Sequence, residues 1–276
     1  KPMSMSSFRD SGMTIDLLFV ESLSGCNKPG YKAATHPVAV VTHEKPSQTG
    51  GVHINTVSIA TMVIGESGTG KSASMRNLDP AKTLLIQAVK KPLSFKSTNW
   101  KPVAKGQSGS VYVTDDSAHI VKAIERTDKK IIVIDDFQYI LANEFMRRVT
   151  DVEVGNSAFT KYNEIARHAW DILMAAGSLA DYKRVYILSH TATDDFGKTK
   201  IKTIGKLLDE KIVMEGLVTI VLRTEVSDGE YTCATRNNGR DTVKSSMGLF
   251  DADCVPNDLA EIDSAITAFY DIHASA

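Results

Sequence analysis

The feature that most constrains this chain is the segment GESGTGKS at residues 65–72, where the glycines, lysine and serine have the spacing G-x-x-x-x-G-K-[ST]. Glycines let successive backbone N–H groups turn inward around an anion, and a following helix adds partial positive charge at its N-terminus. Residues 59–64 form a short apolar run typical of a buried strand, and Ser72 opens a segment that predicts a helix. These flanks favour a phosphate-binding loop over a glycine-rich turn that matches by chance.

The loop assigns roles to individual residues. Lys71 is expected to reach the β- and γ-phosphates of a nucleotide, and the Ser72 hydroxyl is expected to complete a Mg²⁺ shell. The residues expected to contact the nucleotide are Gly65, Glu66, Ser67, Gly68, Thr69, Gly70, Lys71, Ser72 and Ala73.

A second motif follows about 60 residues later, where the β-branched apolar run 131–134 leads into Asp135 and Asp136. A central strand of a parallel sheet is apolar on both faces, and the carboxyl ends of such strands are where open α/β sheets place ligands. We expect Asp135 to hold Mg²⁺ through water and Asp136 to orient the attacking water. Because the run lies beyond a phosphate-binding loop, with another apolar strand at 83–87 between, it predicts a Walker B motif.

Two segments are rich in lysine. Lys198, Lys200 and Lys202 alternate as on one face of a strand, and Lys206 extends the basic character. Between positions 80 and 114 there are six lysines and no acidic residue, with Phe95 and Trp100 among them. Both patterns suggest surfaces for a nucleic-acid backbone, the second with aromatic rings that stack on unpaired bases. The alternative for 198–202 is a solvated edge strand, since lysines protect exposed edges from pairing.

Composition limits the remaining choices. The chain has 276 residues, 42% hydrophobic and 24% charged, which is typical of a globular protein. Its net charge is −1, so any nucleic-acid contact requires local basic patches. No apolar run approaches the roughly 18 residues of a membrane span, and we expect a cytoplasmic protein without a membrane partner. Residues 58–276 are expected to form the nucleotide-binding domain, and 1–57 an N-terminal extension of uncertain structure with strands at 15–20 and 38–41.

A resemblance rests on five segments: MVIGESGTGKS, IIVIDDFQYI, YILSHT, KIKTIGKLLDEKI and RNNGRDTVKSSMGLF. With them the chain resembles the phage-encoded RecA-like P-loop ATP-binding proteins, including the Sak-type single-strand annealing and recombination ATPases, over about residues 58–270. The resemblance implies an α/β fold with a mostly parallel sheet flanked by helices and an antiparallel C-terminal hairpin. It also implies ATP and Mg²⁺ as cofactors.

The resemblance adds roles for two further groups of residues. The strand expected at 185–188 ends in Ser189 and His190, where RecA-like ATPases place a polar residue that senses the γ-phosphate. The loop after that strand lines a single-stranded DNA path in RecA relatives, and here it carries Lys198, Lys200, Lys202 and Lys206.

One position departs from the pattern of the RecA proteins. They usually take their catalytic glutamate from the end of the second strand, and residues 86–90 contain none. The catalytic carboxylate is then Asp136 or Glu66, or hydrolysis is slow.

Three functions remain open. The first is an ATPase acting on single-stranded DNA in recombination, annealing or replication, as a homo-oligomeric ring or filament. In it Arg223, Arg236 or Arg240 of a neighbouring subunit would stabilise transition-state charge. The second is a nucleotide-switched adaptor or loader that docks a single-strand-binding or replication protein with little turnover. The third, a small-molecule kinase, is disfavoured because no arginine-rich lid is evident.

Overall fold

The computed structural model describes residues 57–104, 109–150 and 160–272, which belong to one compact unit. The strands expected at 15–20 and 38–41 lie outside the described residues, as does nearly all of the predicted extension 1–57. That division of the chain therefore stays a prediction.

Nine strands form one sheet in the described part of the chain, in the order β3-β2-β4-β5-β1-β7-β8-β9, with β6 paired to β5. Their bounds are β1 Ile59–Gly65, β2 Thr83–Gln87, β3 Val111–Val113, β4 Ile131–Asp135, β5 Arg184–Thr193, β6 Thr199–Ile201, β7 Ile220–Ser227, β8 Glu230–Ala234 and β9 Cys254–Pro256. The pairs from β3 to β7 are parallel, whereas β5–β6, β7–β8 and β8–β9 are antiparallel.

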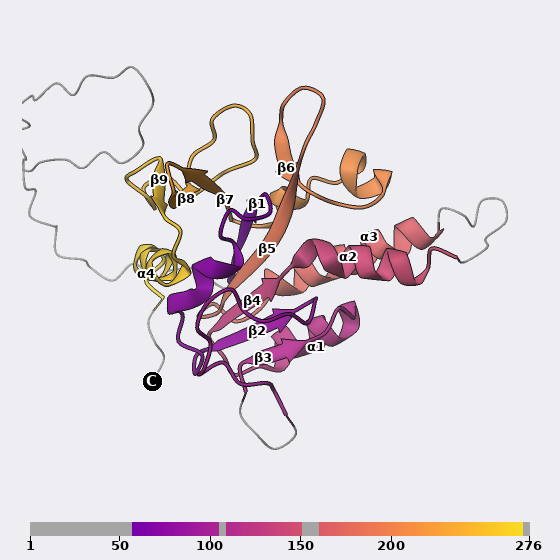
Figure 1. Ribbon diagram of the computed structural model, residues 1–276, viewed down its shortest axis with the longest axis horizontal. Helices are drawn as coiled ribbons and strands as arrows, with labels where there is room; N and C mark the ends of the chain where they lie inside the picture. The colour runs from indigo at the N-terminus through magenta and orange to yellow at the C-terminus, as the bar shows by residue number, and fades with distance from the viewer. Residues whose placement is uncertain (1–56, 105–108, 151–159, 273–276) are drawn as a thin grey trace, which may run out of the picture. The chain divides into compact units, whose positions relative to one another are not determined.

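The helical segments are η1 Ser72–Asn77, α1 Ser117–Arg126, α2 Phe137–Arg147, α3 Thr160–Ala176, η3 Leu207–Lys211, η4 Met214–Leu217 and α4 Leu259–Phe269. Helices α1, α2 and α3 cover one face of the sheet, and α4 with η1 covers the other (Figure 1). Both faces of the central strands are therefore buried.

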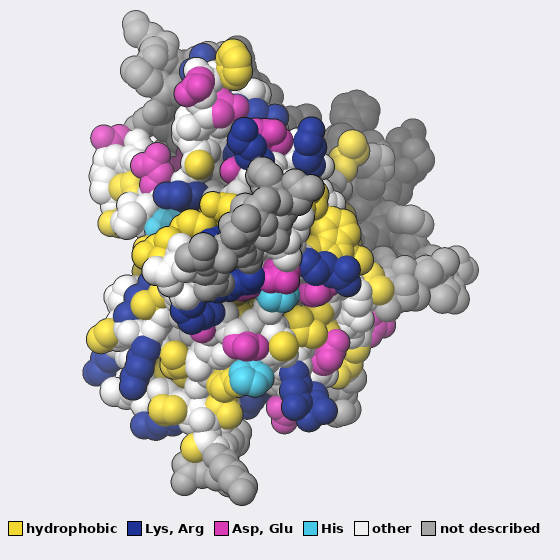
Figure 2. Space-filling view, turned by 90° about the vertical axis from the view of Figure 1, so that its right-hand side faces the viewer, with side chains coloured by type: hydrophobic (Ala, Val, Ile, Leu, Met, Phe, Trp, Pro, Cys, Tyr) yellow, Lys and Arg dark blue, Asp and Glu magenta, His cyan; other side chains and the backbone are white. Residues whose placement is uncertain are grey.

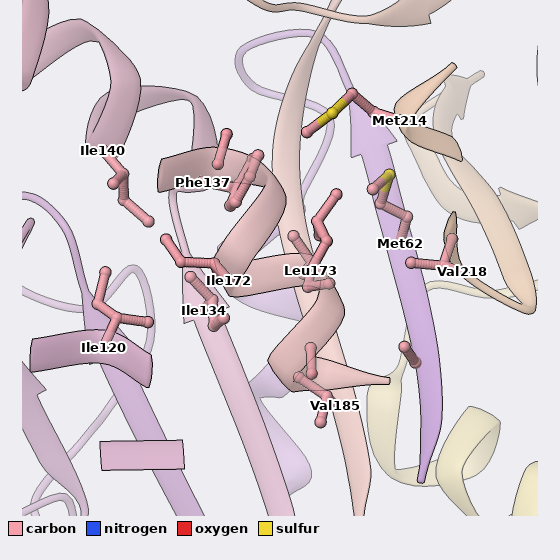
Figure 3. Close-up of a cluster of buried hydrophobic side chains, with 14 of the residues drawn as sticks. Met62, Ile120, Ile134, Phe137, Ile140, Ile172, Leu173, Val185, Met214 and Val218 are labelled. Atoms are coloured by element: carbon pink, nitrogen blue, oxygen red, sulfur yellow. The ribbon is translucent and has the colours of Figure 1, made fainter. Parts of the chain in front are cut away.

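The two hydrophobic clusters explain why these sequences form central strands. In β1, Met62 and Ile64 face α2 and α3, while Val63 faces the cluster under α4, as the period of two requires. Figure 3 shows Met62 with Phe137, Ile172 and Leu173 in the first cluster. Because every residue of β1 and β4 is buried, both strands are apolar apart from Thr61 and the last residue of each.

The expected architecture, an α/β fold with a mostly parallel sheet flanked by helices and an antiparallel C-terminal hairpin, is confirmed. Strand β5, which carries Ser189 and His190, lies between the P-loop strand β1 and the Walker B strand β4. The carboxyl ends of these three neighbouring strands therefore meet at one edge. No helix of the described residues is long and apolar enough to cross a membrane.

Two expectations need correction. The helix after the P-loop is only a six-residue 3-10 segment, because Ser72, Ser74 and Asn77 favour helix poorly and the Asp79-Pro80 pair disfavours continuation. The expected stacking surface around Phe95 and Trp100 is also wrong. Trp100 is buried and Phe95 partly buried under β2, ring to ring at 6.0 Å, because large aromatic rings gain most by leaving water.

Candidate nucleotide site

The P-loop adopts a backbone that only glycine accommodates easily at two positions. Gly68 and Gly70 have φ angles of 85° and 86°, in the left-handed region. Gly65 is needed for space, since a Cβ there would lie 2.0 Å from Thr224 Oγ1 of β7. At Gly70 a Cβ would lie 2.5 Å from Asn257 Nδ2, which also donates to the Gly70 carbonyl at 3.0 Å. The P-loop is thus packed against Thr224 and Asn257, which lie more than 150 positions later in the chain.

Lys71 lies inside this loop with only 6% of its surface exposed. Its Nζ donates to the carbonyl oxygens of Gly65 at 2.8 Å and Glu66 at 2.7 Å. Burial lowers the pKa of Lys71, and the carboxylates of Asp136 and Asp135 oppose that shift. The two carbonyl oxygens that Lys71 binds are uncharged acceptors. Phosphate oxygens carry negative charge and form stronger hydrogen bonds with an ammonium group, so a bound phosphate could replace the carbonyls as the partner of Lys71.

Ser72 and Asp135 meet across the site. The Ser72 hydroxyl donates to Asp135 at 2.9 Å from Oδ1 and 3.0 Å from Oδ2. Burial, and then the neighbouring Asp136, raises the pKa of Asp135 to about 6. Within the described residues no group of three or more His, Cys, Asp or Glu side chains gathers as a metal cage. The Ser72 hydroxyl and the Asp135 carboxylate supply oxygen donors, and they fit Mg²⁺, which in nucleotide sites binds one or two protein oxygens and fills its shell with phosphate and water.

Asp136 is nearly buried, and its two oxygens differ. Its Oδ2 lies 3.3 Å from Lys91 Nζ and 3.4 Å from His190 Nε2. Its Oδ1 is buried without a hydrogen-bond partner among the described residues, and so is the Ser189 hydroxyl. Such an unpartnered atom typically costs about 1–3 kcal/mol, so native folds contain few. One of the two follows the carboxyl end of β4. The other lies within β5, which continues to Thr193 and so does not end before Ser189 as expected from the sequence; Ser189 is in register with Ile64 of β1. Both fit a site shaped for a polar ligand.

His190 connects the site to the segment beyond it. It is the register partner of Gly65, its ring packs edge-on against Tyr139 at 5.9 Å, and its carbonyl accepts from Lys202 N at 2.8 Å. Burial, and then the positive charge of Lys71, lowers the pKa of His190 despite the opposing Asp136. The lowered pKa favours the neutral imidazole at pH 7.

The fold thus brings together six of the residues predicted from sequence: Lys71, Ser72, Asp135, Asp136, Ser189 and His190. Glu66 and Ser67 are exposed, while Thr69 and Ala73 are partly buried. Sequence reasoning missed Lys91, Thr224 and Asn257. Lys91 was counted only within a lysine-rich segment, and nothing near Thr224 or Asn257 in the sequence indicates a contact with the P-loop.

Of the lysines expected to contact DNA, Lys198, Lys200 and Lys202 lie on or directly beside the hairpin formed by β5 and β6, and Lys206 lies at the start of η3. Lys198, Lys202 and Lys206 are exposed, whereas Lys200 is half-buried and its Nζ donates to the Asp209 carbonyl at 2.9 Å. The turn is not purely basic, because Asp194 and Asp195 precede an exposed Phe196. Figure 2 shows the side that faces right in Figure 1, where basic and acidic side chains of the described residues intermix. Any contact with a polyanion on this side would therefore be local.

The three arginines considered for a neighbouring site differ in their surroundings. Arg223 makes ion pairs with Glu225 and with Asp241, the latter at 3.2 Å. Arg236 pairs with Asp253 at 2.8 Å. The Arg240 side chain is exposed and, among the described residues, makes no ion pair. Its carbonyl accepts from Thr199 N at 2.8 Å, which fixes the basic turn 236–240 beside β6.

Comparison with known proteins gives matches only among solved structures. No protein-family model and no curated protein matches the chain. A DnaB-like replicative helicase, described with its interactions with primase, matches with 11% identity and a TM-score of 0.37, covering 63% of this chain. The chain spans about half (52%) of that helicase. A KaiC-like protein from Pyrococcus horikoshii matches with 13% identity, a TM-score of 0.38 and coverage of 73% of this chain and 89% of that one. The function proposed next rests on the site residues themselves.

Proposed function

We propose that this protein binds ATP with Mg²⁺ and hydrolyses it. The observation that carries the proposal is the meeting of the P-loop residues Lys71 and Ser72 with the two carboxylates at the end of β4. Lys71 would bind the β- and γ-phosphates, while Ser72 and Asp135 would hold the metal. Mg²⁺, when bound, would neutralise charge on the phosphate oxygens.

Asp136 is the better candidate to orient the attacking water. Its Oδ1 is buried and has no hydrogen-bond partner in the part of the chain that the structure describes, whereas Glu66 is exposed. A carboxylate oxygen that is free and shielded from bulk solvent can accept a hydrogen bond from one water and hold it for in-line attack. The Ser189 hydroxyl and the neutral His190 ring would contact the γ-phosphate side.

The proposal extends to single-stranded DNA as the partner. Strand β5 runs from Ser189 and His190 directly into the hairpin that carries Lys198 and Lys202, and Lys202 N bonds to the His190 carbonyl. A shift at the γ-phosphate sensor would therefore reach the lysines through one continuous strand. Arg240, fixed beside β6, is added to this surface. The resemblance to Sak-type phage ATPases supports a role for such an activity in recombination, annealing or replication.

The adaptor function stays as the second candidate because of one observation. Gln87 occupies the end of β2, where RecA proteins usually have the catalytic glutamate, and its amide binds the Lys91 carbonyl at 3.3 Å. A site with only Asp136 for the water would turn over slowly, and a bound nucleotide would then act mainly as a switch for docking another protein.

The deciding experiment measures ATP affinity and ATP turnover with and without single-stranded DNA, for the wild type and Lys71→Ala. We expect DNA-stimulated turnover in the wild type. The variant should lose measurable binding because the P-loop cation between the phosphates is gone. Normal binding and turnover in Lys71→Ala would refute the site. Tight ATP binding without DNA-stimulated turnover would favour the adaptor.

A further inference from the structure

The loop after β2 enters the candidate site by a path that involves three contacts. Ala88 N donates to the Asp135 carbonyl at 2.8 Å, and the Gln87 side chain donates to the Lys91 carbonyl at 3.3 Å. Asn143 of α2 donates to the Ala88 carbonyl at 3.4 Å. The first contact ties the loop to the end of β4, the second closes the loop on Lys91, and the third ties the loop to α2. In this arrangement Lys91 Nζ lies 3.3 Å from Asp136 Oδ2.

The two partners of this ion pair have different environments. The Asp136 side chain is 5% exposed, while that of Lys91 is 41% exposed, so Lys91 reaches in from the rim. Burial is the main cause of the lowered pKa values of Lys71 and His190, and the charge of Lys91 adds to both shifts. The same charge opposes the rise in the pKa of Asp135, so Lys91 belongs to the electrostatic cluster of the site. Its neighbour Lys90 is exposed and, among the described residues, makes no side-chain contact to this site.

We propose that Lys91 is a positioning residue that occupies one oxygen of Asp136 and thereby aims the other, Oδ1, at the attacking water. This inference rests on the proposed ATPase function and assigns a role that neither the P-loop nor the Walker B motif contains. A buried carboxylate that rotates freely presents either oxygen to the water. A cation fixed on Oδ2 removes that ambiguity and offsets the cost of burying the charge beside Asp135.

Gln87 supports the same arrangement, because its side chain holds the backbone of Lys91. In this chain the residue at the end of β2, Gln87, binds the backbone of Lys91 through its side-chain amide. The carboxylate is Asp136, which follows the neighbouring strand β4. The departure from the RecA pattern therefore has a structural counterpart: the second strand supports the carboxylate instead of providing it.

The first test is a double-mutant cycle on ATP turnover. Lys91→Ala should lower kcat by about 10- to 100-fold, the range seen when a partner that orients a site residue is removed. Affinity for a non-hydrolysable ATP analogue should change by less than about 3-fold. In an Asp136→Asn background, Lys91→Ala should add almost nothing, and Lys91→Arg should recover part of the loss because it keeps the charge. Lys90→Ala is the matched control.

The second test does not depend on turnover. NMR titration of the His190 imidazole in nucleotide-free protein should show a higher pKa in Lys91→Ala, because a positive neighbour has been removed, and no change in Lys90→Ala.

Three outcomes separate the possibilities. A Lys91→Ala variant that matches Lys90→Ala in both tests overturns the inference. An equal loss of kcat in the wild-type and Asp136→Asn backgrounds overturns it too, because Lys91 then acts without Asp136. A wild type that binds ATP with no measurable turnover refutes the hydrolysis part of the proposed function and the positioning role with it, whatever the His190 titration shows.

Discussion

Burial changes the acid–base chemistry of Asp135, one of the expected Mg²⁺ ligands. Its pKa is about 6 in the folded protein against 3.8 for an ordinary aspartate, so the folded state binds the proton more tightly than the unfolded chain. Stability should therefore fall as the pH rises from about 4 to about 6 and stay level above that. The difference amounts to at most about 3 kcal/mol.

We therefore predict that the ionised Asp135 carboxylate lowers the stability of the folded protein and is kept because it binds the metal. In the absence of Mg²⁺ and nucleotide, Asp135→Asn should raise the free energy of unfolding at pH 7.5 and leave it unchanged near pH 4. Thermal or urea unfolding in EDTA at both pH values checks this. Added Mg²⁺ and ATP should stabilise the wild type much more than the variant. A variant less stable than the wild type at pH 7.5 would contradict the cause given for the pKa.

Asp136 separates nucleotide binding from chemistry. Asp136→Asn keeps the size of the side chain but removes the charge that polarises water, so turnover should fall by about 10²-fold or more. ATP-analogue affinity, measured by titration calorimetry, should be nearly unchanged because Lys71 and Ser72 are intact. Glu66→Gln is the control and should turn over normally. Loss in the Glu66 variant and none in Asp136→Asn would move the role to Glu66.

At the scale of elements, the β5–β6 hairpin links the γ-phosphate side to the candidate DNA surface. Replacing Lys198, Lys200 and Lys202 by alanine should weaken binding of single-stranded DNA regardless of its sequence. The slope of log affinity against log salt should flatten by about 0.7 for each lost phosphate contact. ATP binding should survive. Fluorescence anisotropy at several salt concentrations, with and without a non-hydrolysable ATP analogue, measures all three.

The matched control for the hairpin removes the same charge elsewhere. Lys90, Lys96 and Lys101 are exposed in the other lysine-rich segment, whose aromatic residues pack into the core. Their triple alanine variant should bind DNA nearly as the wild type does. If the control loses affinity and the hairpin variant does not, DNA binds over the loop after β2. If neither loses it, the hairpin lysines only protect an edge strand.

At the scale of the whole molecule, the predicted ring or filament implies a site completed by a neighbour. Arg223, Arg236 and Arg240 remain the candidates, and Arg240 differs in making no ion pair within the described residues. An arginine acting across an interface would leave ATP binding intact when mutated. Each arginine→alanine variant should therefore be assayed for binding and turnover alongside sedimentation of the protein with nucleotide.

Mixing two inactive variants tests whether an arginine acts on the site of a neighbouring subunit. Lys71→Ala subunits have an intact arginine but no working P-loop, and subunits lacking the arginine have the reverse. If an arginine acts in trans, mixing the two inactive proteins should restore part of the turnover, and the rate per subunit should rise with protein concentration. No recovery for any of the three arginines, with an oligomer present, would mean that the site is complete in one subunit.

Features that depend on the local order of residues were predictable before the fold was known. The glycine and lysine spacing at 65–72 and the apolar runs before Gly65 and Asp135 predicted the loop, the strands and four residues of the site, namely Lys71, Ser72, Asp135 and Asp136. The resemblance added Ser189 and His190. Strands that are buried on both faces are continuously apolar. The polar residues that bind ligands follow directly after such an apolar run, so the end of the run marks them. Such signals span a few residues and are visible without a fold.

The tertiary structure decided what depends on groups far apart in the chain. Lys91 reaches Asp136, 45 positions later, only because β2 and β4 are adjacent and Gln87 turns the loop back. Asn257 braces Gly70 across 187 positions, and Trp100 packs into the core although the lysines around it suggested solvent. The position of a charged or aromatic side chain depends on the path of its backbone. Packing between distant segments sets that path, and no local pattern in the sequence indicates it.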